Sequence, residues 1–121
     1  IEKNCELSQI AKVWLNKLPG PYTLILKLKE KNVISDRVAP GLDTVGVRIP
    51  KHWFTKYVKE LQIPIITTSA NVKGGEFMTS MDDLDLEIKA GVDFIIYDGK
   101  NDGRASKIVN LTTGEPEVVR K

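Results

Sequence analysis

A cluster of small polar side chains follows directly on an apolar run in the middle of this chain. Ile65 to Thr68 has the β-branched composition of a buried strand, and Ser69, Ala70 and Asn71 come next. Hydroxyl and amide groups at the end of a strand are suited to binding a polar ligand. Gly74 and Gly75 then let the backbone turn away. Alternatively, Ser69 and Asn71 only satisfy backbone groups in a turn, as Ser and Asn often do.

An arginine stands beside a glycine in the segment from Thr44 to Ile49. Apolar and polar residues alternate here, so Arg48 is predicted to point away from the core face, and Gly46 leaves space beside it. A guanidinium keeps its charge and can bind two oxygens of a phosphate or carboxylate at once. Arg48 is therefore a candidate anion ligand, although an arginine on a polar strand face is more often simply solvated.

Two further polar residues lie in a hairpin predicted at the end of the chain. Ser106 begins a strand that runs to Leu111, and Arg120 ends its antiparallel partner from Glu117, with a tight turn between the two. The candidate site therefore contains Arg48, Ser69, Asn71, Ser106 and Arg120, with the turn at Lys73 to Gly75 at its edge.

Several other chemistries find little support in the sequence. Neither glycine-rich phosphate-binding fingerprint is present. His52 is the only histidine, so we expect neither a zinc site nor a histidine-based triad within these residues. Asp98 and Asp102 flank glycines but match a calcium loop poorly. We expect no metal ligands and name no catalytic side chain.

The predicted elements alternate between helices and strands. Apolar spacing predicts helices at residues 4–18, 52–61 and from Ser80 to about 91, and strands at 22–28, 44–49, 65–68, 92–97, 106–111 and 117–120. Residues 33–43 are expected to form a loop with at most a short strand or turn. This order predicts an α/β fold with a twisted, mixed β-sheet flanked by helices. We expect residues 1–121 to form one domain.

Composition is typical of a globular protein. The 121 residues carry 18 basic and 16 acidic side chains, a net charge of +2, which gives no support to a nucleic-acid-binding function. The first residues have neither a signal peptide nor a membrane-spanning pattern, and we expect no membrane partner. The single cysteine, Cys5, fits a cytoplasmic location and a structural role.

Four motifs, taken in order, resemble the YrdC-type threonylcarbamoyl-AMP synthases. They are Pro19-Gly-Pro-Tyr-Thr-Leu-Ile-Leu, Thr44-Val-Gly-Val-Arg-Ile-Pro, Pro64-Ile-Ile-Thr-Thr-Ser-Ala-Asn-Val-Lys-Gly, and Gly103-Arg-Ala-Ser-Lys-Ile-Val-Asn with a final Val-Val-Arg. Any one of these motifs alone would be weak evidence. Their order and intervals cover nearly the whole chain, and they imply a YrdC/RibB-like fold.

The resemblance implies an enzyme that converts L-threonine, bicarbonate and ATP into threonylcarbamoyl-AMP and pyrophosphate, for a tRNA modification. It places Arg48 on an anionic group of the threonine or phosphates, Ser69 and Asn71 in the nucleotide and phosphate pocket, and Ser106 near the threonine and α-phosphate. Arg120 would reach the nucleotide. Mg²⁺ would accompany ATP, and RNA or the downstream tRNA-modifying complex would be further partners.

The chain departs from the family pattern in two places. The family's N-terminal segment, with a Lys-x-Arg pair that holds phosphates, does not occur here, so we expect the chain to be the C-terminal portion of a longer protein and less active alone. The family prefers Ser-Thr after the late glycine loop, whereas this chain has Ser106 followed by Lys107.

Two alternative functions remain open at this stage. Related domains in carbamoyltransferases form a carbamoyl-adenylate from carbamoyl phosphate and need no threonine. A non-catalytic RNA-binding module is the other alternative, against which stand the small net charge and the lack of an aromatic and basic stripe.

Overall fold

The computed structural model describes residues 1–101 and 103–120, and these form two compact units. The first unit contains Ile1–Gln62 and Ala105–Lys121, and the second contains Ile63–Arg104. Each unit is described separately below. That residues 1–121 form one domain stays a prediction.

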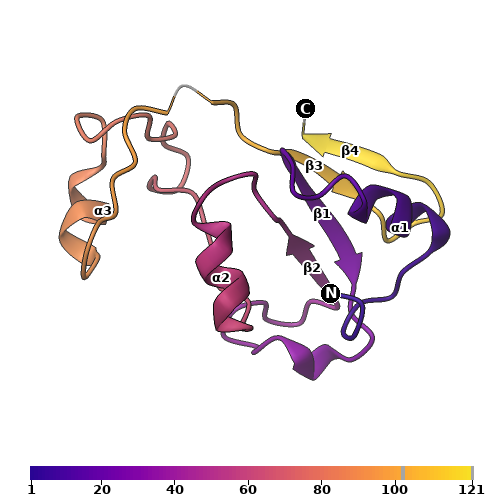
Figure 1. The fold of residues 1–121 in the computed structure, drawn as a ribbon. Coiled ribbons are helices and arrows are strands. Elements are labelled where there is room, and N and C mark those ends of the chain that lie inside the picture. Colours follow the sequence, from indigo (N-terminus) through magenta and orange to yellow (C-terminus); the bar gives the residue numbers. More distant parts are fainter. Residues whose placement is uncertain (102, 121) are drawn as a thin grey trace. The chain divides into compact units, whose positions relative to one another are not determined.

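A mixed four-stranded sheet forms the centre of the first unit (Figure 1). Its order is β2-β1-β3-β4, with β1 at Tyr22–Lys27, β2 at Thr44–Val47, β3 at Lys107–Asn110 and β4 at Glu117–Arg120. The β1 strand pairs antiparallel with β2 and parallel with β3, and β4 returns antiparallel to β3. The predicted mixed sheet and C-terminal hairpin are confirmed.

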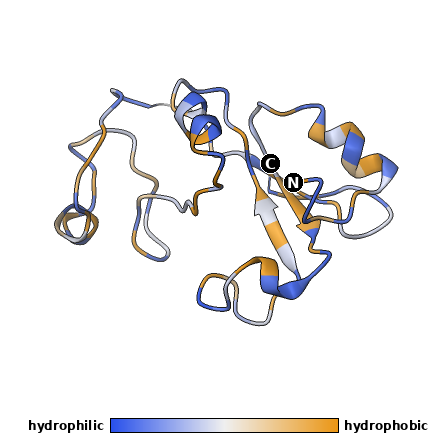
Figure 2. Ribbon diagram, turned by 60° about the horizontal axis from the view of Figure 1, so that its bottom comes forward, coloured by the Kyte–Doolittle hydropathy of each residue, from blue (hydrophilic) through white to orange (hydrophobic). Residues whose placement is uncertain are grey.

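Helix α1, at Gln9–Leu15, covers one face of this sheet. Its N-terminus is capped by Ser8, whose hydroxyl accepts a hydrogen bond from the Ala11 N–H at 3.1 Å. Hydrophobic and hydrophilic bands alternate along α1 (Figure 2), and its apolar side packs against the strands. The buried core beneath consists of Cys5, Ala11, Leu24, Leu26, Leu28, Val109 and Leu111. The helix is shorter at both ends than its apolar pattern predicted.

The Pro19-Gly20-Pro21 turn joins α1 to the sheet. The Gly20 N–H donates a hydrogen bond to the Ile49 carbonyl at 2.9 Å, so the segment before β1 stays beside the segment after β2. Gly20 is buried, and a Cβ at this position would lie 2.5 Å from the Lys17 carbonyl oxygen. A side chain at residue 20 therefore requires the turn to move.

Two further helical segments complete the first unit. A 3-10 turn, η1, occupies Lys31–Val33 in the predicted loop, and helix α2 spans Thr55–Leu61. The α2 helix begins three residues later than predicted, after a turn in which the His52 Nδ1 accepts a hydrogen bond from the Phe54 N–H at 3.2 Å.

The second unit has little regular structure. Among the described residues of this unit there is one helix, α3 at Leu86–Gly91, capped by Asp85, whose Oδ1 accepts a hydrogen bond from the Glu87 N–H at 2.8 Å. The strands predicted at 65–68 and 92–97 are wrong: the backbone there is irregular. A strand needs a neighbour to bond its backbone groups, and in the described chain neither segment has one. Ile66 and Phe94 are each 75% exposed.

None of the helices in the described residues is long and apolar enough to cross a membrane.

Candidate functional site

One row of residues crosses the sheet near the start of β1. Thr23 pairs with Ile108 on β3, and Ile108 pairs with Arg120 on β4. On the other side, Leu24 pairs with Val47, and continuing this antiparallel register by one residue sets Arg48 opposite Thr23. Paired residues point to the same face of a sheet. Thr23 alternates with the buried Leu24, so this face is the one opposite the core.

Ser106 is the buried polar centre of this row. It precedes β3 directly, and only 3% of its surface is exposed. Its hydroxyl lies 2.7 Å from the hydroxyl of Thr23, a distance at which either group can donate the hydrogen bond. The chain therefore satisfies a buried hydroxyl through a residue 83 positions away in the sequence.

Arg120 binds Ser106 through one edge of its guanidinium. The Nε and Nη2 groups donate to the Ser106 carbonyl oxygen at 3.0 and 2.8 Å, and Nη2 also donates to the Ser106 hydroxyl at 3.3 Å. Among the described residues, Nη1 has no hydrogen-bond partner. This half-buried cation is thus held in place while two N–H donors remain able to bind an anion.

Arg48 is the second cation of the row. Its side chain is exposed, as predicted, and makes no hydrogen bond or ion pair with any described residue. Three strand spacings of about 4.8 Å separate the row's two ends, so the two arginine Cα atoms are roughly 14 Å apart. Such a separation allows the two guanidinium groups to bind different parts of one extended polyanionic ligand.

Thr23 belongs to this site but was not among the predicted residues. It stands in a run of mostly apolar residues, so the sequence alone gives no reason to assign its hydroxyl to a site. The available signal was its place in an alternating strand, which turns Thr23 away from the buried Leu24 and Leu26. The register that brings it to Ser106 could not be read from the sequence.

Ser69 and Asn71 lie in the second unit. Ser69 is exposed, in irregular backbone, and has no hydrogen bond to a described residue. The Asn71 side-chain amide donates to the carbonyl oxygens of Val72 and Gly75, each at 3.0 Å, and so closes the glycine turn. Its Oδ1 atom is buried and has no hydrogen-bond partner among the residues that the structure describes. Asn71 has the turn role considered above and also one unused acceptor.

A carboxylate organises the loop that precedes α3. The Asp83 oxygens accept hydrogen bonds from the Ser80 and Thr79 N–H groups and from both hydroxyls, at 2.7 to 3.3 Å. The Ser80 backbone, followed by the Thr79 hydroxyl, lowers the pKa of Asp83 from 3.8 to about 2. Ser80 was predicted to start a helix; it instead contacts Asp83, and the helix begins at Leu86.

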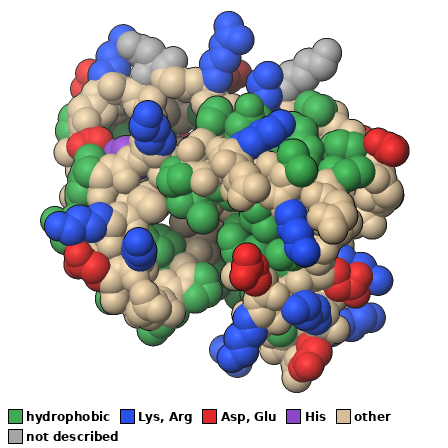
Figure 3. Space-filling view, turned by 45° about the vertical axis from the view of Figure 1, so that its right-hand side comes forward, with side chains coloured by type: hydrophobic (Ala, Val, Ile, Leu, Met, Phe, Trp, Pro, Cys, Tyr) green, Lys and Arg blue, Asp and Glu red, His purple; other side chains and the backbone are tan. Residues whose placement is uncertain are grey.

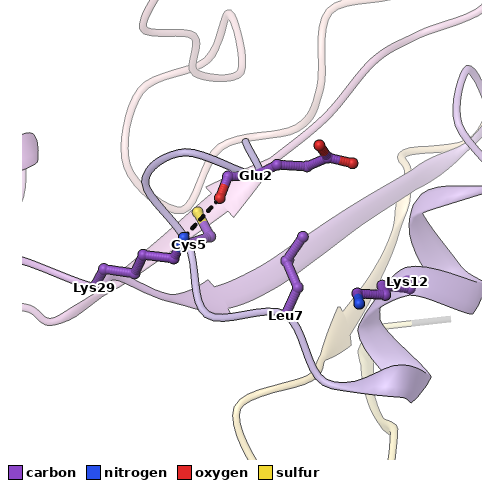
Figure 4. Close-up of a pocket in the computed structure, with 5 residues that line it drawn as sticks. All are labelled: Glu2, Cys5, Leu7, Lys12 and Lys29. Carbon is purple, nitrogen blue, oxygen red and sulfur yellow. Dashed lines mark hydrogen bonds between the residues drawn. The ribbon is translucent and has the colours of Figure 1, made fainter.

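A hollow of about 440 Å³ in the first unit lies apart from the row. It is lined by Glu2, Cys5, Leu7, Lys12 and Lys29 (Figure 4). Lys29 Nζ donates to the Glu2 carbonyl oxygen at 2.8 Å, and burial raises the pKa of the Cys5 thiol. A thiol that resists ionisation is a poor nucleophile, in agreement with a structural role for Cys5.

Surface charge and possible metal ligands also bear on this site, because an anion or a metal ion would need them. Lysine and arginine side chains are distributed among acidic and hydrophobic ones on the face shown in Figure 3. In the described part of the chain, no three His, Cys, Asp or Glu side chains are grouped to hold a metal ion. The segment that matched a calcium loop poorly includes Asp102, which lies outside the described residues.

The fold defines a class: an α/β protein built on a mixed four-stranded sheet, in which the buried Ser106 is held between Thr23 and Arg120 on the face opposite the core. The family model Sua5/YciO/YrdC, described as telomere recombination, matches residues 1–121. The chain belongs to this family.

Three similar proteins place the chain within the family. A Methanocaldococcus jannaschii protein, named provisionally as a threonylcarbamoyl-AMP synthase, is 43% identical over 102 residues, which are 83% of this chain and 46% of that protein. The structure of Pyrococcus abyssi Sua5 complexed with L-threonine matches 95% of this chain and 34% of that one, with TM-score 0.81 and 32% identity. Escherichia coli YciO matches 99% of this chain and 59% of its own, with TM-score 0.82 and 27% identity. The chain thus spans about half the length of the first of these relatives.

Proposed function

We propose that the protein containing this chain is a threonylcarbamoyl-AMP synthase that uses L-threonine, bicarbonate and Mg²⁺-bound ATP. Relatives from Pyrococcus abyssi and Bacillus subtilis carry this name without qualification, and a family neighbour was solved with L-threonine. The observation that carries the proposal is the pair of arginines at the two ends of the sheet row, Arg48 and Arg120, the second of which is held by Ser106.

The proposed chemistry requires a site that neutralises anions. The amine of threonine forms an N–C bond to the carbon of bicarbonate, and water leaves to give a carbamate. A carbamate oxygen attacks the α-phosphorus of ATP, forming one P–O bond as the bond to pyrophosphate breaks. Both the attacking group and the leaving group are negatively charged, so fixed cations lower the barrier by orienting them and reducing their repulsion.

Each residue has a distinct part in this proposal. Arg48, which has no partner among the described residues, binds the threonine carboxylate or a phosphate. Arg120 directs its Nη1 donors to the nucleotide, and Ser106 holds that guanidinium. Ser69 and Asn71 are candidate nucleotide ligands by their match to the family motif. Mg²⁺ is expected to accompany ATP, because phosphate oxygens are ligands that this ion prefers.

Product analysis tests this proposal directly. The protein made from its complete gene, incubated with ATP, Mg²⁺, bicarbonate and L-threonine, should release pyrophosphate and form a product with the mass of threonylcarbamoyl-AMP. The reaction should stop when threonine is omitted. Adenylate formation from carbamoyl phosphate without threonine would instead identify a carbamoyltransferase. Salt-sensitive tRNA binding with no product would favour an RNA-binding module.

A further inference from the structure

We propose that Thr23 is a positioning residue that fixes the Ser106 hydroxyl and, through it, the Arg120 guanidinium. The inference rests on the proposed function for its effect on ATP, but the contact itself can be tested without any ligand. Thr23 lies on β1, between β2, which Arg48 directly follows, and β3, which Ser106 directly precedes.

Thr23 is itself held by packing. A Cβ placed on Gly46 would lie 3.4 Å from the Thr23 Cγ2 atom, so the threonine methyl covers the glycine on β2. Threonine has a stiff side chain because two heavy atoms share its Cβ. Contact of the methyl with one strand therefore leaves the hydroxyl directed to Ser106, at 2.7 Å.

The hydrogen-bonding capacity of the Ser106 hydroxyl shows what the Thr23 hydroxyl contributes. A serine hydroxyl has one donor and two lone pairs. Arg120 Nη2 already donates to the Ser106 hydroxyl. If Thr23 also donates, both lone pairs are used; if Ser106 donates, its proton is used. In either case the Thr23 contact removes the freedom of Ser106 to rotate away from Arg120.

Three hydrogen bonds to Ser106 therefore hold one edge of the Arg120 guanidinium. Two of them reach the Ser106 carbonyl oxygen, which any residue at position 106 could supply, whereas the third depends on the serine hydroxyl that Thr23 orients. Loss of the Thr23 hydroxyl should therefore loosen the guanidinium without removing it. Because Nη1 is the edge expected to face the nucleotide, the effect should appear in ATP affinity.

Thr23→Val in the complete protein tests this role, since valine keeps the shape and removes the hydroxyl. The KM for ATP should rise roughly five- to tenfold, as expected for weakening one charge-assisted hydrogen bond, while kcat stays within about twofold. Thr23→Ser, which restores a hydroxyl, should recover most of the affinity. Thr112→Val is the matched control, because Thr112 is also half-buried and bonds Asn110 Oδ1 at 2.7 Å, at the other end of β3.

A double-mutant cycle in unfolding equilibria tests the contact without substrates. Thr23→Val and Ser106→Ala should be non-additive by roughly threefold or more in the unfolding constant, while Thr112→Val with Ser106→Ala should be additive. Additive behaviour of the first pair would overturn the proposal, as would a KM for ATP like that of the control. A wild-type protein that forms no product would contradict the proposed function, and the cycle would still decide whether Thr23 positions Ser106.

Discussion

At the scale of single residues, the site depends on which side chains are satisfied and which are left able to bind. Ser106 is buried and fully engaged, Arg120 is engaged along one edge, and Arg48 is exposed without a partner among the described residues. All three were predicted as candidate site residues from their types, and that role stays a prediction. Thr23 was not predicted, because a hydroxyl in an apolar strand is informative only when the register is known.

Arg48→Ala should strongly reduce activity with little effect on folding. An exposed cation without a described partner contributes little to stability, whereas loss of one charged ligand in a phosphoryl-transfer site costs about 10²-fold in kcat/KM. Arg48→Lys should recover part of this loss, since lysine keeps the charge but not the planar fork. Arg37→Ala, at another exposed arginine, serves as the control. Equal activity of the Arg48 and Arg37 variants in steady-state assays would exclude Arg48 from the site.

Asn71→Ala should weaken ATP binding, measured by calorimetry, while the far-ultraviolet circular dichroism spectrum stays unchanged. Its amide closes the turn to Gly75, and its buried Oδ1 has no hydrogen-bond partner within residues 1–101 and 103–120. Loss of both turn contacts should cost about 1–2 kcal/mol of local stability. Asn32→Ala, at an exposed asparagine, is the control. An unchanged ATP affinity would leave Asn71 with its turn role alone.

At the scale of elements, the spacing of apolar residues correctly predicted those helices and strands that pack into the core. The β1 strand and the centre of α1 were predicted correctly because each buries one face in the same core. The pattern failed at 65–68 and 92–97, where β-branched composition indicated strands but no described segment pairs with them. Composition predicts which residues suit a strand, whereas a neighbouring strand decides whether one forms.

Gly20→Ala should destabilise the first unit by about 1–3 kcal/mol, the usual cost of overpacking. The new methyl would stand 2.5 Å from the Lys17 carbonyl oxygen, so the turn that aligns β1 must shift. Gly114→Ala is the matched control, because a Cβ there meets no atom within 4 Å. Urea denaturation measures both variants, and equal midpoints would show that the turn accommodates the methyl freely.

Acid should loosen the loop that Asp83 organises. The Asp83 pKa is lower in the folded protein, about 2, than its usual 3.8, so the ionised carboxylate stabilises the folded state above pH 4 and this contribution is lost as the pH falls towards 2. Wild-type stability should therefore decline more steeply over this range than that of Asp83→Asn. Asp82→Asn, an exposed neighbour, should decline like the wild type. Parallel curves for the wild type and Asp83→Asn would contradict the role of Asp83.

At the scale of the whole molecule, family membership and the sheet row support the same function. The family model covers residues 1–121, and the chain spans 46% of its Methanocaldococcus jannaschii relative. The sheet register sets Arg48 on the same face as Ser106 and Arg120, which belong to the C-terminal hairpin. Ser69 and Asn71 belong to the second unit, and their part in the same site remains a prediction.

The most direct test of the central claim is threonine-dependent exchange of labelled pyrophosphate into ATP by the complete protein. With bicarbonate present, the wild type should catalyse exchange only when L-threonine is added, and Arg48→Ala should reduce the rate about 10²-fold. Exchange that proceeds equally well without threonine, or that is unaffected by Arg48→Ala, would contradict the assignment of this sheet face as the site of threonylcarbamoyl-AMP formation.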